Sequence, residues 1–379
     1  MRTAIVTETW PPEINGVALT VQGLAHGLQR QGHSVEVIRA QRPDDAGATT
    51  PNDFPGLLLR SAALPRYAGL RIGLPAQARL LRHWSAQRPD SIYIATEGPI
   101  GHSALSAARS LGIPACTGFH TRFDDFIGHY GFSWLAPLVF AAMRRFHNRA
   151  AATIVPTLEL AEFLSARRFA NVRVVRRAVD IDLFDPSRHD PVLRREWGVR
   201  EDSLAVIHVG RIAAEKNLEL AIDAFRRIQR NHAGARFIIV GDGPEQARMA
   251  RANPDFHLAG MRRGHDLARH YASGDLFLFP SLTETFGNVT LEAMASGLPV
   301  VAFDYGAARE HIPDADCGVR VPFADAAAFV DQAVTLADDP ARLARMKVAA
   351  RAAVASLCPN SAASNFADLL TSLVTRRAA

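Results

Sequence analysis

The sequence predicts two α/β domains, each built around a parallel, doubly wound β-sheet. Short apolar runs alternate with helical patterns along the chain, and this alternation breaks once in a polar stretch before it restarts. The 379 residues also exceed the roughly 150 of one ordinary domain. Strands that alternate with helices in this way pair in parallel and are buried on both faces.

The composition indicates a soluble globular protein. Hydrophobic residues make up 48% and charged residues 21%, which excludes disordered and fibrous chains. The chain opens MRTAIVTETWPP without a secretory signal, and no apolar run approaches the roughly 18 residues of a membrane span. Cys116, Cys317 and Cys358 have no disulfide or zinc spacing. We therefore expect a cytoplasmic protein.

The first domain is predicted to span residues 1–177. Its buried strands are the short apolar runs Ala4–Thr7, Val35–Ile38, Ser91–Ala95 and Ile113–Phe119. One helix follows the first strand, because apolar residues recur there on one helical face, at Val17, Val21, Leu24 and Leu28. A second helix is predicted from about Pro99 to Leu111.

A polar, proline-marked stretch around Val174–Pro186 predicts a linker, and a second domain follows over residues 178–357. Its predicted strands are Leu204–Val209, Phe237–Val240, Leu276–Phe279 and Val300–Phe303. The apolar stripe of its first helix consists of Leu218, Ile222, Phe225 and Ile228. Residues 358–379 are predicted to form a C-terminal helix that returns to the first domain.

Charged residues cluster after the strands of the second domain, where ligands of such sheets bind. Arg211 and Lys216 follow one strand, and a guanidinium fork with a point charge suits a diphosphate. The turn Gly287-Asn288-Val289 adds backbone N–H groups at a helix start. Glu284 and Glu292 can only accept hydrogen bonds when ionised, so they suit sugar hydroxyls rather than the anion. The alternative is that these four charged residues form surface ion pairs.

Two further patterns contain residue types that often serve function. Asp180-Ile181-Asp182 spells D-x-D, a pair that can hold a divalent metal, but its place in the linker favours a structural turn, and Asp314-Ala315-Asp316 has the same interpretation. His120 follows the predicted strand that ends at Phe119, where it could bind a sugar hydroxyl or simply be satisfied in the core. No G-x-G-x-x-G follows a strand, which weakens a dinucleotide-dehydrogenase hypothesis.

The segments RIAAEKNLELAIDAF, VGDGPE and ETFGNVTLEAMASGLPVVA, in this order, resemble glycosyltransferase family 4, whose members are retaining enzymes with the GT-B fold. Glu284 and Glu292 match the E-x7-E motif of that family. The loop Pro12–Val17, the FHT at Phe119–Thr121 and the VDIDLF segment also match in place. Ala178 departs from the family, which usually has Gly before Val-Asp. Within the family, the chain is most similar to the GDP-mannose-dependent α-mannosyltransferases that make mannosylated glycolipids.

The resemblance implies a role for each matching residue. Arg211 and Lys216 would hold the donor diphosphate, Glu284 the donor sugar and Glu292 the ribose. The backbone of Phe286, Gly287, Asn288 and Val289 would lie beside that sugar. His120 would contact the donor sugar across a cleft between the two Rossmann-like domains, and Gly16 would let the first-domain loop approach the phosphates.

These roles predict a retaining transferase that needs no metal and no other cofactor. An inverting enzyme needs a carboxylate base, and Glu97, Asp124 and Asp125 have no evident base-like environment in the sequence. The expected reaction moves mannose from GDP-mannose onto a lipid-linked or glycolipid acceptor in an α linkage. A UDP-hexose donor is the alternative, and a sugar-nucleotide epimerase or a non-catalytic nucleotide-binding protein is a weaker one.

Charge distribution predicts an anionic partner for the first domain. Residues 1–180 carry 20 basic and 13 acidic side chains, against 23 and 25 in the remainder. No acidic residue lies between Asp53 and Asp90, where six arginines occur: Arg60, Arg66, Arg71, Arg79, Arg82 and Arg88. Apolar residues are interleaved with them, namely Tyr67, Leu70, Ile72, Leu74, Leu80, Leu81 and Trp84. We expect residues 60–88 to dock on the anionic inner face of the cytoplasmic membrane. The alternative is a solvated helix face over core leucines, and no nucleic-acid partner is expected.

Overall fold

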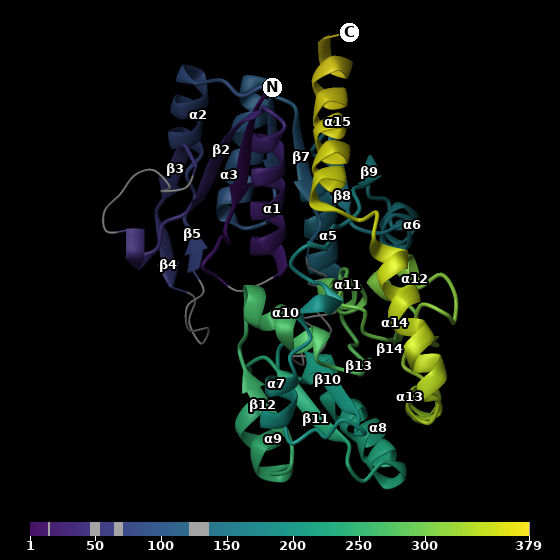
Figure 1. Ribbon diagram of the computed structural model, residues 1–379. Coiled ribbons are helices and arrows are strands. Elements are labelled where there is room, and N and C mark those ends of the chain that lie inside the picture. The colour runs from purple at the N-terminus through teal and green to yellow at the C-terminus, as the bar shows by residue number, and fades with distance from the viewer. Residues whose placement is uncertain (14–15, 46–53, 64–70, 121–135, 379) are drawn as a thin grey trace. The chain divides into compact units, whose positions relative to one another are not determined.

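The structure is a computed structural model, and it describes residues 1–13, 16–45, 54–63, 71–120 and 136–378 (Figure 1). Contacts within the chain fall into two compact units. The first comprises Met1–Arg177 and Pro359–Ala379, and the second comprises Ala178–Cys358. Each unit has its own sheet and its own core.

The first unit follows the predicted alternation of strands and helices. Its strands are β1 Arg2–Thr7, β2 Ser34–Ala40, β3 Gly56–Leu59, β4 Ser61–Ala63, β5 Arg71–Gly73, β6 Ser91–Ile94, β7 Ala115–Gly118, β8 Ala152–Val155 and β9 Val172–Val174. Its α-helices are α1 Gly16–Arg30, α2 Gln77–Ala86, α3 Pro99–Leu111, α5 Ala136–His147, α6 Leu158–Ala166 and α15 Pro359–Ala378, with a short 3₁₀ turn at Pro43–Asp45.

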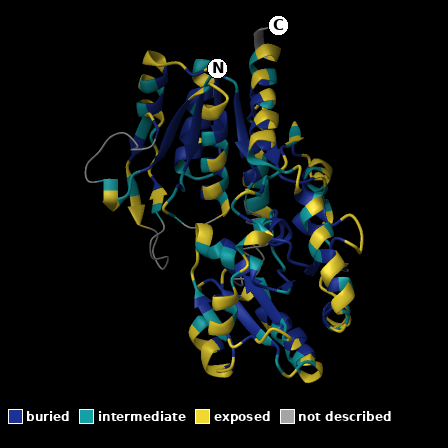
Figure 2. Cartoon of the chain, in the orientation of Figure 1, coloured by how far each residue is buried: buried dark blue, intermediate teal, exposed yellow. Residues whose placement is uncertain are grey.

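The main sheet of the first unit has the order β3-β2-β1-β6-β7-β8-β9, and every neighbouring pair is parallel. The chain runs outward from β1 through β3 and then continues on the other side of β1 from β6, so the winding reverses between β1 and β6. The sheet is therefore doubly wound. Its inner strands β1, β6, β7 and β8 are mostly buried, whereas many exposed residues lie on the helices (Figure 2).

The last helix, α15, packs on the first unit although it follows the second unit in sequence. A Cβ on Gly27 of α1 would lie only 2.4 Å from Cβ of Ala363. The ring of Phe366 packs at 5.0 Å against Tyr93 of β6, and Gln31 donates to Ser364 over 2.9 Å. The small residues Gly27 and Ala363 thus allow α1 and α15 to approach closely.

The second unit repeats the same plan. Its strands are β10 Ala205–Val209, β11 Arg236–Val240, β12 His257–Gly260, β13 Leu276–Phe279, β14 Val300–Phe303 and β15 Val319–Val321. Its α-helices are α7 Pro191–Glu196, α8 Leu218–Asn231, α9 Gln246–Ala252, α10 Gly264–Ala272, α11 Asn288–Ala295, α12 Gly306–His311, α13 Ala326–Ala337 and α14 Pro340–Val354, with 3₁₀ turns at Pro186–Arg188 and Ala214–Lys216. The parallel sheet has the order β12-β11-β10-β13-β14-β15, so its winding reverses between β10 and β13.

Most predicted elements agree with the observed ones. The strands Leu276–Phe279 and Val300–Phe303 and the helix Pro99–Leu111 have the predicted bounds. The prediction was too long for Ile113–Phe119, since only Ala115–Gly118 pairs with its neighbours. The second unit ends at Cys358, one residue later than predicted, because Pro359 begins α15.

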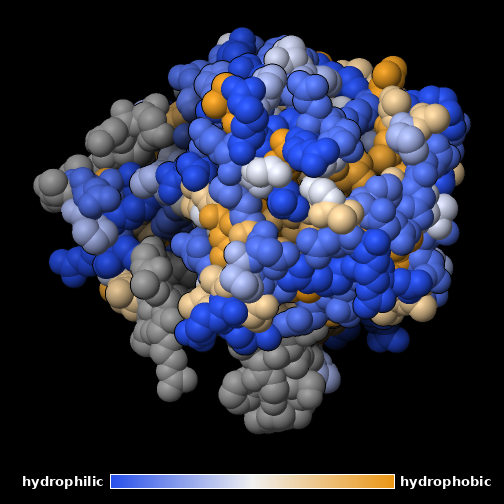
Figure 3. Space-filling model, turned by 60° about the horizontal axis from the view of Figure 1, so that its bottom comes forward, coloured by the Kyte–Doolittle hydropathy of each residue, from blue (hydrophilic) through white to orange (hydrophobic). Residues whose placement is uncertain are grey.

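Within the described ranges, none of the helices combines the length and the apolar character needed to cross a membrane. On the face drawn in Figure 3, hydrophobic residues lie in small groups among hydrophilic ones.

Candidate functional site

The reversal between β10 and β13 brings together the two loops that carry the predicted diphosphate and sugar residues. Arg211 and Lys216 follow β10, and Glu284 follows β13. These strands are paired neighbours, with Val206 opposite Leu276. The carboxyl edge of a parallel sheet at such a reversal is where ligands of this class of sheet bind.

The loop after β10 packs backbone to backbone against the loop after β11. A Cβ on Gly241 would lie 1.9 Å from the carbonyl oxygen of Gly210, and one on Gly243 would lie 2.2 Å from that of Ile212. The backbone N–H of Ile212 donates to the carbonyl of Asp242 over 3.0 Å. The two glycines of the GDGP segment are therefore required for this close contact, which fixes the path of the loop toward Lys216.

Lys216 and Glu284 form an ion pair between Nζ and Oε1, with side chains only 17% and 15% exposed. Ser281 donates to the same carboxylate oxygen over 2.8 Å. The ammonium also lies 5.8 Å from the ring centroid of Phe279. The structure thus joins the predicted phosphate ligand and the predicted sugar ligand directly, in a half-buried setting where charge interactions are stronger than in water.

Arg211 lies closer to solvent than Lys216. Its guanidinium is 3.5 Å from Oε1 of Glu215, and its side chain is 44% exposed. Glu215 is buried, and its carbonyl accepts from the backbone N–H of Leu282 in the loop after β13. Both cations are ion-paired, as the surface-pair alternative would require, but the pairs lie at the carboxyl ends of β10 and β13 rather than at scattered places.

The turn before α11 has the backbone geometry of a helix start. Gly287 has φ of 92°, a left-handed conformation that favours glycine. The carbonyl of Phe286 accepts from the N–H of Ala307 over 2.7 Å, and the Phe286 ring is buried. The Phe286 ring and carbonyl are therefore engaged within the fold, whereas Asn288 and Val289, in the first turn of α11, are half-buried.

Glu292 lies one turn after Asn288 in α11. It bonds to Tyr271 rather than to Lys216 or Glu284. Its Oε2 accepts from the hydroxyl of Tyr271 over 2.9 Å. Burial raises the pKa of Glu292 to about 7, although the Tyr271 hydroxyl acts in the opposite direction. This carboxyl therefore changes charge near neutral pH, unlike an ordinary glutamate.

In the first unit, His120 follows β7, and its ring is held by the buried Tyr93 and the half-buried Arg177. Arg177 donates from Nη2 to Nδ1 of His120 over 2.8 Å, and Nε2 lies 2.6 Å from the hydroxyl of Tyr93. Because a guanidinium can only donate, Nδ1 is the acceptor and the proton of the neutral ring is on Nε2. Burial, then the charge of Arg177 and the neighbouring His147, hold the pKa of His120 well below its usual value. His120 is thus a neutral group of fixed tautomer.

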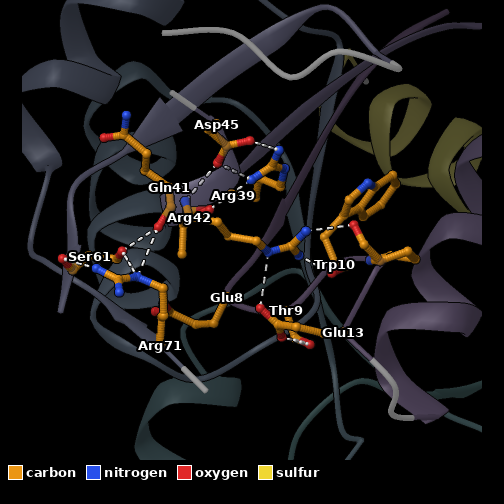
Figure 4. Close-up of polar contacts among 12 residues, drawn as sticks. Glu8, Thr9, Trp10, Glu13, Arg39, Gln41, Arg42, Asp45, Ser61 and Arg71 are labelled. Carbon is orange, nitrogen blue, oxygen red and sulfur yellow. Dashed lines mark hydrogen bonds and ion pairs between the residues drawn. The ribbon is translucent and has the colours of Figure 1, made fainter. Parts of the chain in front are cut away.

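The loop between β1 and α1 is held by the network drawn in Figure 4. Arg42 donates to the carbonyls of Trp10 and Pro11 and pairs with Glu13 over 3.2 Å. Arg39 and Asp45 form a second, buried pair beside it at 2.7 Å. This network fixes the loop up to Glu13, and α1 then starts at Gly16, the residue assigned to the phosphates. Residues 14–15, Thr121 of the FHT segment, and Asp124 and Asp125 lie outside the described residues.

The D-x-D in the linker makes a turn. Oδ1 of Asp180 accepts from the backbone N–H groups of Asp182 and Leu183, over 3.2 and 2.9 Å. The second pattern behaves in the same way, since Asp314 accepts from the N–H of Asp316 over 3.0 Å. In both patterns the first carboxylate has a structural role.

The prediction that residues 60–88 dock on lipid is partly wrong. Leu80 and Trp84 of α2 are fully buried in the core of the first unit, and Trp84 donates to Glu36 over 3.1 Å. They are therefore unavailable to a membrane, as the core-helix alternative required. Arg71 also bonds internally, to Ser61 and to the carbonyl of Gln41. Arg60, Arg82 and Arg88 remain exposed, and Arg66, Tyr67 and Leu70 lie outside the described residues.

Sequence reasoning missed several partners of these residues, namely Tyr93, Arg177, Glu215, Tyr271 and Ser281. Three of the five contacts join residues at least 21 positions apart, so no spacing pattern predicts them. Glu215 and Ser281 are the exceptions, since Glu215 lies four residues after Arg211 and Ser281 lies three residues before Glu284.

Comparison with known proteins agrees with this architecture. Residues 14–183 match the family model described as Glycosyltransferase Family 4, and residues 203–339 match the one described as Glycosyl transferases group 1. A GDP-mannose-dependent alpha-mannosyltransferase of Mycobacterium tuberculosis is 34% identical over 325 residues, which cover 85% of this chain and 84% of that protein. An alpha-monoglucosyldiacylglycerol synthase of Acholeplasma laidlawii is 27% identical, with coverage of 79% and 80%.

Among solved structures, that of Anabaena HepE in complex with UDP and glucose superposes with a TM-score of 0.74 over 98% of this chain and 100% of that chain, at 21% identity. This likeness confirms the predicted GT-B architecture. The fold and the matching family models are those of a glycosyltransferase. The chain belongs to glycosyltransferase family 4.

Proposed function

We propose that this glycosyltransferase moves mannose from GDP-mannose, with retention of configuration, onto a hydroxyl of a lipid-linked or glycolipid acceptor, which gives an α linkage. The single observation that carries the proposal is the half-buried Lys216–Glu284 pair at the reversal of the second sheet. It puts a cation for a diphosphate and a carboxylate for sugar hydroxyls side by side. The name of the M. tuberculosis relative supports GDP-mannose as the donor.

In the proposed reaction, the bond between C1 of the sugar and the diphosphate oxygen breaks while the acceptor oxygen bonds to C1 on the same face. The proton of the acceptor hydroxyl passes to the departing phosphate oxygen, so no protein base is consumed. Lys216 and Arg211 stabilise the negative charge that develops on the diphosphate, and such preorganised charge is usually the largest catalytic contribution.

The remaining residues bind and orient the donor. Glu284 accepts from hydroxyls of the transferred sugar, and the backbone at Phe286–Val289 lies beside it. Glu292 accepts from the ribose, and Gly16 allows the loop after β1 to approach the phosphates. We assign His120 to the donor sugar as a neutral group, because its proton is held on Nε2 by the bond from Arg177.

A UDP-hexose donor is the second candidate. The observation that favours it is the similarity to HepE, solved with UDP and glucose, together with the relative named as an alpha-monoglucosyldiacylglycerol synthase. Family membership leaves the epimerase and the non-catalytic alternatives without support.

The deciding experiment incubates the protein with bacterial membrane lipids and either GDP-[¹⁴C]mannose or UDP-[¹⁴C]glucose. We expect label in a lipid product from GDP-mannose, a mass increase of one hexose, and an α-anomeric proton by NMR. Transfer from UDP-glucose alone would contradict the mannose assignment, and a β-linked product would contradict retention.

We also propose that the enzyme works at the inner face of the cytoplasmic membrane as a peripheral protein. Support comes from the glycolipid names of its relatives and from the exposed Arg60, Arg82 and Arg88. Each arginine near an anionic surface contributes about 1 kcal/mol of binding. Co-sedimentation with anionic liposomes should be lost at high salt and in an Arg60→Ala/Arg82→Ala variant, because both arginines are exposed. Equal binding to neutral liposomes would contradict this electrostatic attachment.

A further inference from the structure

A hollow of about 480 Å³ lies in the first unit, at the point where its sheet reverses. Its walls include Pro75 and Gln77 at the start of α2, Glu97 in the turn after β6, and Pro99, His102 and Ser106 of α3. The order of strands reverses between β1 and β6, so Glu97 follows one of the two strands that flank the reversal. Ligands of doubly wound sheets bind at this place.

The carboxylate of Glu97 is held by a buried chain of hydrogen bonds. Nε2 of His147 lies 3.1 Å from Oε1 of Glu97, and Nδ1 of the same ring lies 2.8 Å from the hydroxyl of Thr117. The side chain of His147 is fully buried, whereas that of Glu97 is 13% exposed. An ionised carboxylate only accepts, so Nε2 donates to Glu97 and Nδ1 accepts from Thr117. Thr117 and His147 therefore orient Glu97, which lines the hollow.

The chemistry of the walls selects the kind of ligand. Glu97, His102, Gln77 and Ser106 supply hydrogen-bonding groups, and the rings of Pro75 and Pro99 supply apolar faces. A sugar ring or another polyol has hydroxyls that bond to the polar side chains, and C–H faces that pack against the proline rings. A phosphate would meet the Glu97 carboxylate, and none of the described lining residues is itself a lysine or arginine; Arg149 lies behind the wall and donates to the Ser106 hydroxyl over 3.4 Å. The hollow is thus suited to a neutral polyhydroxylated group.

The hollow is linked to His120 through His147. His147 packs against Phe119, the residue before His120, with ring centroids 5.3 Å apart. Glu97 and His120 also follow the adjacent strands β6 and β7, which pair in parallel. A group bound at Glu97 therefore lies at the same edge of the sheet as the residue assigned to the donor sugar.

We propose that this hollow binds the neutral, polyhydroxylated part of the acceptor, with Glu97 accepting from one of its hydroxyls and Thr117 and His147 as positioning residues. That the bound group belongs to the acceptor rests on the proposed function, whereas the binding of a neutral polyol does not. In this proposal Glu97 binds the substrate and does not act as a base. This agrees with the proposed transfer reaction, which needs no protein base.

Ligand-observed NMR tests the site without any nucleotide, with methyl α-D-glucopyranoside and glucose 6-phosphate as probes. We expect the neutral sugar to bind the native chain more tightly than the phosphate ester. Glu97→Gln should weaken this binding about tenfold, since a charged hydrogen-bond acceptor is lost. Glu162→Gln, on an exposed glutamate of α6, is the matched control and should bind as the native chain does. Glu284→Gln separates this hollow from any sugar bound by the second unit, and it should leave the probe signal unchanged.

The positioning residues have their own test. Thr117→Val removes the hydroxyl that donates to His147 and should weaken binding of the neutral sugar as Glu97→Gln does. Thr117→Ser keeps a hydroxyl and should bind the sugar as the native chain does. In the transfer assay, Glu97→Gln should raise the KM for the acceptor and leave the KM for the donor unchanged. Undiminished probe binding in Glu97→Gln, loss only in Glu284→Gln, or tighter binding of the phosphate ester would overturn the inference. These results do not depend on which nucleotide sugar is the donor, so failure of the donor assignment would be seen separately.

Discussion

Nη2 of Arg177 donates to Nδ1 of His120 over 2.8 Å, and this one bond determines where the proton of the imidazole lies. Arg177 is half-buried, and desolvation lowers the pKa of its guanidinium to about 10, yet it keeps its charge at neutral pH. A charged neighbour and burial both oppose protonation of His120. The ring therefore presents one fixed tautomer and does not act as an acid or a base near pH 7.

This relationship predicts the behaviour of His120 in a titration. From pH 5.5 to 8, ¹⁵N spectra of the native protein should show a neutral His120 ring with its proton on Nε2. In Arg177→Met the pKa of His120 should rise, since the nearby positive charge is gone, and transfer should slow. Tyr93→Phe keeps the Arg177 bond and should keep the proton on Nε2. A native His120 that titrates with the ordinary histidine pKa would refute the assignment.

Glu284→Gln should nearly abolish transfer and leave nucleotide binding intact, because the amide keeps the shape but loses the charge that accepts from sugar hydroxyls. Lys216→Ala should weaken GDP binding and slow transfer together, by a few kcal/mol in a site that excludes water. Calorimetric titration with GDP and single-turnover rates separate the two effects.

The matched control for the Lys216–Glu284 pair is Arg200→Ala, which breaks an exposed pair with Asp202 and should change neither binding nor rate. If Lys216→Ala binds GDP as the native protein does, Lys216 is only the counter-charge of Glu284. A Glu284→Gln enzyme that keeps most of its kcat would remove Glu284 from the donor site.

The second sheet was predictable because each of its central strands is buried on both faces. Leu276–Phe279 and Val300–Phe303 are short, uninterrupted apolar runs, which are typical of the inner strands of a parallel sheet. The proximity of Lys216 and Glu284 followed from the same reasoning, since strand ends in a parallel sheet share one edge. The contacts of His120 were not predictable, because Tyr93 and Arg177 lie 27 and 57 residues away from it.

Periodicity also could not decide what covers an amphipathic helix. The Leu80 and Trp84 positions of α2 are four apart, which defines one face but not whether lipid or core covers it. The same limit applies to Glu97, whose carboxylate is oriented by His147 from a helix 50 residues further along.

The close contact between the loops after β10 and β11 predicts a large effect of one methyl group. In Gly241→Ala the new Cβ would meet the carbonyl oxygen of Gly210 at 1.9 Å, so the loops must separate. We expect a loss of at least about 2 kcal/mol of unfolding free energy and weaker GDP binding. Gly23→Ala is the control, because nothing lies within 4 Å of its Cβ in α1, and alanine should raise stability slightly. Equal melting temperatures for the two variants would contradict the close-contact argument.

Chelation should change the activity little. Oδ1 of Asp180 in the linker D-x-D is already used by two backbone N–H groups, and Arg211 and Lys216 are the proposed positive charges for the diphosphate. Transfer rates measured with EDTA, and again after adding Mg²⁺ or Mn²⁺, check this expectation. Complete loss in EDTA that either ion restores would show that a metal takes part.

Glu292 predicts a conflict between stability and binding that depends on pH. Its pKa is about 7 in the folded protein and near 4.5 as an ordinary glutamate, so between these values the folded state keeps a proton that the unfolded state has lost. Stability from this group is therefore complete below pH 4.5, falls as the pH rises, and is lost above pH 7, at a cost of about 3 kcal/mol. Glu292→Gln removes the buried charge, so it should be more stable than the native protein at pH 8 and equal to it near pH 5.

The same substitution should weaken GDP binding, because the ionised carboxylate is the proposed acceptor for the ribose hydroxyls. For the native protein, GDP affinity should rise as the pH passes through 7, and for Glu292→Gln this dependence should be absent. Hydrogen exchange of α11 amides reports the stability, and calorimetry at pH 6 and 8 reports the binding. Glu219→Gln, whose side chain is 66% exposed, is the control and should leave both pH dependences unchanged. A Glu292→Gln protein that is less stable than the native one at pH 8 would show that the carboxylate is stabilised in the fold and that burial does not dominate its pKa.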